Sequence, residues 1–213
     1  MPKEKVLIVC AHPDDEVFGV GGTIAKYVKE GRRVAVIVFS FGEKSHIWLQ
    51  EKFSVKMRKK EHQQAKKVLG YESAFYLGIE EGKFNEQKTQ IKERLIRIIK
   101  KWKPRRIFTH NLQDPHPDHQ AVNNVLASAC HDIDYKGEIF MFDVWNVLNL
   151  RRPSYPMLYV DISSTFAQKI EALGCFKSQY LTMIALLWNV YTNAITHGWA
   201  HKTRFAERFF KLK

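Results

Sequence analysis

The chain has 213 residues, of which 45% are hydrophobic, and a formal net charge of +12. This length and apolar content are enough for one core, so we expect a single domain spanning residues 1–213 without a linker or repeat. Its three cysteines form no C-x-x-C pair, which excludes a disulfide-rich scaffold and favours a reducing compartment. The sequence lacks an apolar run of about eighteen residues and a signal-like start, so we expect a cytoplasmic protein without a transmembrane segment.

Apolar runs of strand length alternate with amphipathic, helix-like stretches along the chain. The predicted strands are 6–10, 34–39, 74–77, 107–110, 139–144 and 158–162. The predicted helices are 23–29, 54–68, 87–102, 120–129 and 166–176, with a further helical stretch after Thr182. This alternation predicts an α/β fold, specifically a Rossmann-like three-layer α/β/α sandwich with a mostly parallel sheet.

The first predicted strand is followed by an acidic and histidine-containing cluster, Ala11-His12-Pro13-Asp14-Asp15-Glu16. The strand is a continuous apolar run, as is typical of a buried parallel strand, and Gly21 and Gly22 precede the next helix. The cluster is therefore expected on the loop at the carboxyl end of a strand. Open α/β sheets bind ligands at that edge.

A second cluster, His116-Pro117-Asp118-His119, follows the strand predicted at 107–110. Proline is favoured at the first position of a helix, which makes His116 the N-cap and places Asp118 and His119 in the first turn. The two clusters therefore repeat the same strand-to-helix arrangement, and both histidines of the second cluster can point into one crevice.

Together the two clusters contain the ligands of a catalytic metal site. His12 and Asp15 supply one nitrogen and one oxygen, and His119 or His116 supplies a second nitrogen. Such a three-ligand set is typical of a hydrolytic zinc centre with an open position for water. Asp14 remains beside the metal, where a carboxylate can act as a base. Either cluster alone is also compatible with loop polarity and helix capping, so the prediction depends on their joint occurrence.

The clusters resemble those of the LmbE-like or PIG-L-type N-acetylglucosaminyl deacetylases, zinc enzymes that remove acetyl from an N-acetylated sugar. The resemblance covers nearly the whole chain, and it includes Gly21-Gly22-Thr23, Arg58-x-x-Glu61-x-x-x-Ala65-x-x-x-Leu69-Gly70 and Thr109-His110. It continues weakly through Val160-Asp161-Ile162-Ser163, Lys177-Ser178-Gln179 and Ala206-Glu207-Arg208-Phe209. The resemblance implies hydrolysis of the amide in a small-molecule N-acetylglucosamine conjugate, without identifying that conjugate.

By this resemblance the metal ligands are His12, Asp15 and His119, and Asp14 is the general base that takes a proton from water. Two histidines and one carboxylate suit iron(II) as well as zinc, so both Zn²⁺ and Fe²⁺ are candidate cofactors. A homo-oligomer is compatible with the sequence, which does not specify the quaternary state.

The resemblance also gives roles to the second cluster and to the helix predicted at 54–68. His116 would stabilise the oxyanion and protonate the leaving amine, and Asp118 would orient His116 and keep it cationic near neutral pH. Arg58 would reach the hydroxyls of the substrate. The alternative for Arg58 is an ion pair with Glu61 or a solvated helix face.

Two regions depart from the family's pattern. Glu80 and Glu81 replace a Pro-Asp-Gly turn that many relatives carry, so a sugar contact expected at that turn is in question. In the final third, Trp188 and Trp199 have no counterpart that we can assign. These are the regions in which we expect the substrate preference of this chain to differ.

Lysine and arginine concentrate at 52–67, 92–106 and 202–213. A basic surface of this kind can bind nucleic acid, so the competing hypothesis is a non-catalytic nucleic-acid-binding protein on the same fold. In the first stretch, however, the lysines alternate with apolar positions, as is typical of a solvated helix face. A binding module also has no need of Asp14 beside a metal. We therefore predict an enzyme.

Overall fold

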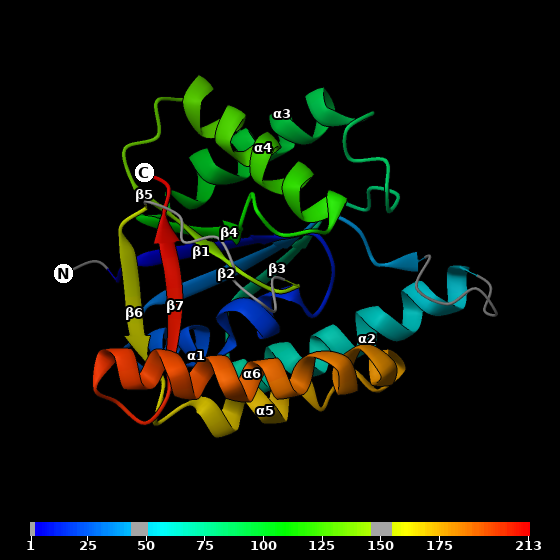
Figure 1. The fold of residues 1–213 in the computed structure, drawn as a ribbon. Coiled ribbons are helices and arrows are strands. Elements are labelled where there is room, and N and C mark those ends of the chain that lie inside the picture. Colours follow the sequence, from blue (N-terminus) through cyan, green and yellow to red (C-terminus); the bar gives the residue numbers. More distant parts are fainter. Residues whose placement is uncertain (1–2, 44–50, 146–154) are drawn as a thin grey trace.

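A computed structural model describes residues 3–43, 51–145 and 155–213 of the chain. The strands are β1 (Lys5–Cys10), β2 (Arg33–Val38), β3 (Ser73–Tyr76), β4 (Arg106–His110), β5 (Glu138–Phe142), β6 (Met157–Asp161) and β7 (Ala206–Lys211). They form a seven-stranded sheet in the order β3-β2-β1-β4-β5-β7-β6 (Figure 1). The strands from β3 to β5 are parallel, and β7 pairs antiparallel with β5 and β6.

Helices cover both faces of this sheet. They are α1 (Asp15–Lys29), α2 (Glu51–Leu69), α3 (Lys88–Trp102), α4 (Pro117–Asp132), α5 (Phe166–Leu173) and α6 (Tyr180–His201). One face carries α1, α2, α5 and α6, and the other carries α3 and α4 (Figure 1). This arrangement confirms the predicted Rossmann-like three-layer sandwich. Among the described residues, none of the helices is long and apolar enough to span a membrane.

The central strands are apolar on both faces because helices cover both faces of the parallel part of the sheet. In β1, Val6, Ile8 and Cys10 belong to the core under α1, whereas Leu7 and Val9 belong to the core under α3 and α4. The carboxyl end of β1 therefore opens between the two helix layers.

That end of β1 lies next to the end of β4, its parallel neighbour. The chain leaves β1 toward α1 on one face and leaves β4 toward α4 on the other face. Doubly wound sheets bind ligands in the crevice that forms where the connections diverge in this way. Both of the predicted clusters follow these two strands, so the fold places them at one crevice.

The structure corrects the predicted start of the first helix. The helix begins at Asp15, about two turns before the predicted start. Gly19 and Gly22 lie inside it, where an added Cβ would overlap the side chains of Phe142 and Ile162. In a sequence, such glycines indicate a boundary, but here they permit close packing of the helix on the sheet. Asp15 is therefore held by a helix rather than by a loop.

The sequence analysis did not predict β7, because its residues fall in the basic stretch 202–213. The strand nevertheless buries Phe209 and Phe210, which are 0% and 1% exposed. Two adjacent aromatic residues do not give the alternating pattern that identifies a half-buried strand. As a result, the antiparallel edge of the sheet was not predicted, although its partner β6 was.

A buried ion pair connects β7 to α5 and α1. Nζ of Lys169 lies 2.7 Å from Oε1 of Glu207, and both side chains are buried. Glu207 also accepts hydrogen bonds from the N–H groups of Gly22 and Thr23, and Lys169 donates one to the carbonyl of Phe18. Removing one charged partner from such a pair typically costs about 3–5 kcal/mol, so the pair contributes to holding α1 against α5 and β7.

Candidate metal centre

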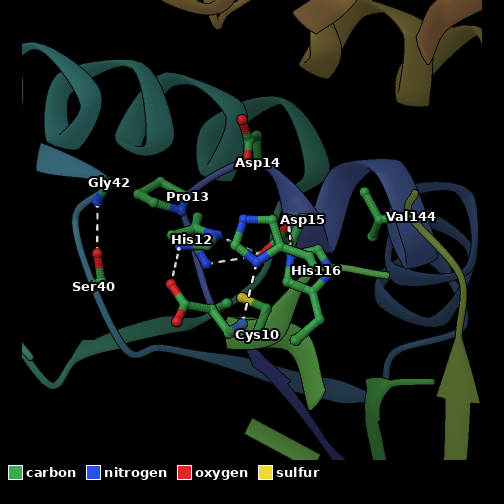
Figure 2. A network of polar contacts seen from close by, with 12 residues as sticks. Cys10, His12, Pro13, Asp14, Asp15, Ser40, Gly42, His116 and Val144 are labelled. Carbon is green, nitrogen blue, oxygen red and sulfur yellow. Dashed lines mark hydrogen bonds and ion pairs between the residues drawn. The ribbon is translucent and has the colours of Figure 1, made fainter. Parts of the chain in front are cut away.

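Two adjacent aspartates, the N-cap Asp14 and the first helical residue Asp15, have different orientations at the start of α1 (Figure 2). Asp14 is the N-cap of α1 and has a φ of 130°, which is rare for a residue with a side chain. Its carboxylate points toward α2, whereas that of Asp15 points toward the histidines of the site. The backbone N–H of His12 donates to Oδ2 of Asp15 at 2.8 Å, which fixes this turn of the chain.

His12, Asp15 and His119 have potential ligand atoms within 4.8 Å of one another. Nδ1 of His12 lies 3.6 Å from Oδ2 of Asp15, and Nε2 of His119 lies 3.4 Å from Oδ1. All three side chains are buried, and Nε2 of His119 makes no hydrogen bond within the described part of the chain. The structure thus brings together the three predicted ligands, and two nitrogens with one carboxylate fit a divalent cation.

Each of the two histidines has a carboxylate behind its other nitrogen. Nε2 of His12 lies 3.2 Å from Oδ2 of Asp118, and Nδ1 of His119 lies 3.1 Å from Oδ1 of Asp114. Carboxylates in this position orient metal-binding histidines and raise their basicity. Asp114 and Asp118 also occur in overlapping groups of potential ligands. We interpret them as outer partners because each contacts the side of a histidine that faces away from Asp15.

These carboxylates reverse the effect of burial on the two histidines. Burial alone lowers the pKa of His12, but hydrogen bonds with Asp118 and Asp15 raise it to about 10. Burial likewise lowers the pKa of His119, while Asp15 and Asp114 raise it to about 9. The centre therefore favours positive charge, and a metal ion bound there has to compete with protons.

The structure pairs the carboxylate of Asp118 with His12, so the expectation that Asp118 orients His116 and keeps it cationic stays a prediction. The carboxylate of Asp118 contacts His12 and accepts the N–H of Gly82 at 3.2 Å. His116 is the N-cap of α4, as predicted, and its Nδ1 accepts the N–H of Asp118 at 3.2 Å. Burial and the neighbouring His119 and His12 lower the pKa of His116. The neutral ring therefore carries its proton on Nε2.

Asp114 is a site residue that the sequence analysis did not single out. Its Oδ1 accepts the N–H of His116 at 3.0 Å, and its Oδ2 accepts the N–H groups of Val144 and Trp145 at 3.2 and 3.1 Å. Burial raises its pKa, but His119 and these contacts outweigh that effect, so the pKa of Asp114 is lowered. In the sequence Asp114 precedes a proline, which indicates only a turn.

His110 is a second residue whose role was not predicted, although its dipeptide Thr109-His110 carried part of the resemblance. It lies at the end of β4, is fully buried, and stacks on His119 with ring centroids 3.8 Å apart. Nε2 of His110 accepts the N–H of Ala11 and lies 3.3 Å from Oδ2 of Asp15. Burial lowers the pKa of His110 to about 4, so the ring is a neutral support for the ligands.

Asp14, the predicted base, forms an ion pair with Arg58 of α2. Its Oδ2 lies 3.2 Å from a guanidinium nitrogen of Arg58, which also donates to the carbonyl of Pro13 at 2.9 Å. Burial raises the pKa of Asp14 to about 7, although Arg58 opposes this shift. Gly42, at φ 67°, lies against the guanidinium and leaves no room for a Cβ. Arg58 is therefore paired with Asp14 rather than with Glu61.

A buried polar chain supports Asp14 from the opposite side. Oε2 of Glu16 accepts the N–H of Asp14 at 3.1 Å, and Oε1 lies 3.1 Å from Nε2 of His62. Nε2 of His62 also lies 3.0 Å from the hydroxyl of Tyr71, and its Nδ1 lies 2.6 Å from that of Tyr76. Glu16 and His62 are fully buried. This series of polar side chains holds the unusual backbone conformation of Asp14. No residue spacing in the sequence indicates the series.

The predicted site residues border a pocket of about 120 Å³. Its lining includes His12, Asp14, Asp15, Arg58 and His116, together with residues of α6. Glu81, from the turn where the chain departs from the family's pattern, also lines the pocket. The base, two of the candidate ligands (His12 and Asp15) and His116 thus border one space that a small molecule can enter. His119 and Asp118 lie behind this lining.

Parallel-sheet crevices with two histidines and an aspartate around one point are typical of metal-dependent α/β enzymes. Comparison with known families agrees with that class. The family model described as PIG-L, GlcNAc-PI de-N-acetylase, matches residues 7–130. The chain belongs to the PIG-L family, which confirms the resemblance seen in the two clusters.

Relatives in this family are similar along most of the chain. It is 24% identical to a probable N-acetyl-alpha-D-glucosaminyl L-malate deacetylase 2 of Bacillus anthracis, over 98% of this chain and 96% of that protein. The N,N'-diacetylchitobiose deacetylase of Pyrococcus horikoshii superposes with a TM-score of 0.83 at 22% identity, over 99% and 84% of the two chains. The 4-carboxy-2-hydroxymuconate hydratase GalB of Pseudomonas putida KT2440 superposes with a TM-score of 0.84 at 21% identity, over 99% and 96%.

Proposed function

We propose that residues 1–213 form one cytoplasmic catalytic domain, a metal-dependent hydrolase that removes the acetyl group from an N-acetylglucosamine-type conjugate. The observation that carries this proposal is the compact group of His12, Asp15 and His119, with Asp14 lining the same pocket as His12 and Asp15. Hydrolytic metal centres need this combination of three ligands and a base. The deacetylases among the relatives support the acetylated sugar as the substrate class.

His12, Asp15 and His119 would hold the metal, and Zn²⁺ or Fe²⁺ fits this donor set. A divalent cation in such a centre polarises a carbonyl and lowers the pKa of water. Asp14 takes the proton of the attacking water, because its pKa of about 7 places it between base and acid near neutral pH. When the amide C–N bond breaks, the same proton can pass from Asp14 to the leaving amine.

His116 is positioned at the pocket for the oxygen of the acetyl group. With its proton on Nε2, the neutral ring can donate a hydrogen bond to the oxyanion that forms during attack. Protonating the amine would instead require an imidazolium, which the lowered pKa of His116 disfavours. We therefore propose His116 as the oxyanion stabiliser and assign the return of the proton to Asp14, with His116 as the general acid remaining the alternative.

Arg58 is proposed to act on the base and, at the rim of the pocket, on the substrate. Its contact with Asp14 opposes the effect of burial on the pKa of that carboxylate. Because Arg58 lines the pocket, its contact with a sugar hydroxyl remains a prediction. A change in KM and a change in the pH profile distinguish these two actions.

A second candidate function is hydration of an unsaturated carboxylic acid. The specific observation in its favour is the structural similarity to the Pseudomonas putida hydratase, whose TM-score of 0.84 is close to the 0.83 of the chitobiose deacetylase. Both reactions need an activated water molecule, so the ligand set alone does not separate them. Nucleic-acid binding is the third candidate, and its only support is the net charge of +12.

One experiment tests all three candidates. The metal-loaded protein is incubated with a panel of N-acetylglucosamine conjugates (malate-linked, inositol-linked and chitobiose) and acetate release is measured, with metal content determined on the same sample. Parallel reactions with unsaturated dicarboxylic acids are followed by loss of ultraviolet absorbance. We expect acetate from at least one conjugate. Absorbance loss without acetate would favour the hydratase, and binding of DNA at physiological salt without either reaction would favour the nucleic-acid protein.

A further inference from the structure

The outer face of α6 is an unusual surface for a helix on a basic protein. In its 22 residues, Tyr180–His201, the helix has no aspartate, glutamate, lysine or arginine. Its inner side buries Leu186, Val190 and Ala194 in the core under α1. A surface helix normally places charged residues opposite such an apolar side. Here the opposite side is apolar as well.

The exposed apolar residues of α6 form one continuous stripe. We define the α6 stripe as Tyr180, Leu181, Ile184, Trp188, Tyr191, Ile195 and Trp199. From Leu181 onward the spacings are three, four, three, four and four residues, which is the spacing that keeps side chains on one seam of paired helices. Leu181 is 81% exposed and Trp199 is 78% exposed, so the stripe runs the length of the helix. Figure 1 shows α6 on the outside of the helix layer that also contains α1 and α5.

An apolar groove lies along one side of the stripe. It has a volume of about 520 Å³, and its lining combines the apolar side chains of Ile170, Leu173, Phe176, Tyr180, Met183 and Leu187 with one charged residue, Lys177. Tyr180 belongs to both the groove and the stripe. The surface therefore combines protruding side chains with a hollow that can receive them, which is the requirement for a contact between identical faces.

We propose that the α6 stripe is the contact surface for a second copy of this chain, in a twofold dimer in which α6 packs against α6. At roughly 200 Å² for a large side chain, the exposed fractions of the stripe amount to about 800 Å² per copy, which is the area that each partner buries in a stable complex of standard size. Aromatic residues are enriched and charges depleted in the cores of such interfaces. The stripe has both properties.

Charge distinguishes a second copy from a lipid surface as the occupant. Helices that lie on membranes carry lysine and arginine on the side facing away from the lipid, and α6 has neither. On a chain with a net charge of +12, an uncharged helix is also a place where two copies can approach with the least repulsion. The observations therefore favour a protein contact over a membrane contact.

The dimer leaves the candidate active site open. Thr182 and Leu186 line the pocket with Asp14 and His116. On a helical projection at 100° per residue, these two positions lie roughly opposite the α6 stripe. The inference is thus independent of the proposed function, because either can fail without the other.

Sedimentation velocity across a roughly hundredfold range of protein concentration tests the proposal, because a dimer that forms by mass action dissociates on dilution. The wild-type protein should have twice the monomer mass at high concentration. Trp188→Glu, at the centre of the stripe, should be a monomer at every concentration, because it buries an unpaired charge in the contact. Thr196→Glu is the matched control, since it adds the same charge to an exposed position of α6 outside the stripe.

A monomeric wild-type protein, or a Trp188→Glu protein that remains a dimer, would overturn the proposal. If Trp188→Glu does not fold, the double variant Leu181→Gln, Ile184→Gln replaces it, and the same outcomes apply. Flotation with vesicles containing phosphatidylserine is measured in parallel. A wild-type protein that is monomeric in solution and floats with these vesicles would also overturn the proposal, in favour of a lipid surface.

Discussion

The two strand-end clusters have the same layout in the sequence but contribute differently to the site. The cluster after β1 supplies Asp14 and Asp15, whose directions are set by local contacts with Glu16 and His12. The cluster after β4 supplies His119 and Asp118, and the carboxylate of Asp118 contacts His12 of the other cluster. The orientation of Asp15 is thus a local property of its motif, whereas the orientation of His12 depends on both motifs together.

The largest effect should follow from removing a ligand of this shared centre. His119→Ala should lose most of its metal, with a fall in affinity larger than the roughly 10- to 100-fold expected for an outer partner. Elemental analysis after dialysis measures it. His131→Ala is the control, because His131 lies on the same helix with its side chain 91% exposed. Full occupancy of the His119→Ala protein would show that His119 is not a ligand.

The next effect tests the division of roles between the adjacent aspartates. Asp14→Asn should keep the metal and the fold but lower turnover by about a hundredfold or more, because an amide cannot accept the proton. Steady-state kinetics and metal content on one sample separate the two properties. Near-normal turnover would mean that another group accepts the proton and that the strained position of Asp14 serves structure alone.

Substitutions of the outer carboxylates test whether Asp118 and Asp114 strengthen metal binding by the histidines that they contact. Asp118→Asn should weaken metal affinity by roughly 10- to 100-fold through His12, and Asp114→Asn should do so through His119. Competition with a chromogenic chelator gives both affinities. If Asp118→Asn leaves the affinity unchanged and lowers only turnover, Asp118 serves His116, as the family resemblance implied, and our interpretation of the contact with His12 fails.

Arg58 provides a smaller effect that is visible in the pH profile. Asp14 must be ionised to act as a base, so kcat should fall as the pH drops below about 7, the pKa of Asp14. The charge of Arg58 lowers that pKa, so Arg58→Gln should move this acid limb to higher pH, and Arg58→Lys should move it less. An unchanged limb with a raised KM would instead indicate a contact between Arg58 and the substrate.

The smallest effect is expected at His197, which separates the effect of burial on a histidine pKa from the effect of neighbouring carboxylates. Burial lowers its pKa to about 3, the opposite of the outcome at His12 and His119. Its folded pKa lies below its unfolded value, so the stability it contributes is present above about pH 6.5 and is lost as the pH falls. Relative to His197→Gln, the wild type should lose about 1.4 kcal/mol per pH unit below that point. Urea unfolding at several pH values measures this, and parallel curves would contradict it.

The parts of the fold that depend on local patterns were predictable from the sequence. Buried parallel strands such as β1 are continuous apolar runs, and Pro117 correctly indicated the start of α4, with His116 as its N-cap. The missed elements depend on distant contacts. Gly19 and Gly22 belong in a helix only because Phe142 and Ile162 pack against them, and β7 is a strand only beside β5 and β6.

The candidate site shows the same limit. Its three predicted ligands and its base are brought together because their motifs mark strand ends, which a sequence displays. The outer residues Asp114, His110 and His62 have no recognisable spacing, because their roles arise from the tertiary contacts that bury them. The same limit applies to Asp118, whose carboxylate contacts His12, since closeness along a helix does not determine which neighbour a carboxylate contacts.

The buried contact between Glu207 and α1 has a consequence for the order of folding. The residue that accepts the N–H groups of Gly22 and Thr23 is made roughly 185 residues after them. During synthesis the strand that leads to Asp15 can form early, but α1 lacks this contact until residue 207 has left the ribosome. We therefore expect the candidate metal centre to be a late product of folding, so a ribosome-bound chain that ends before β7 should bind metal poorly even though every candidate ligand has been synthesised.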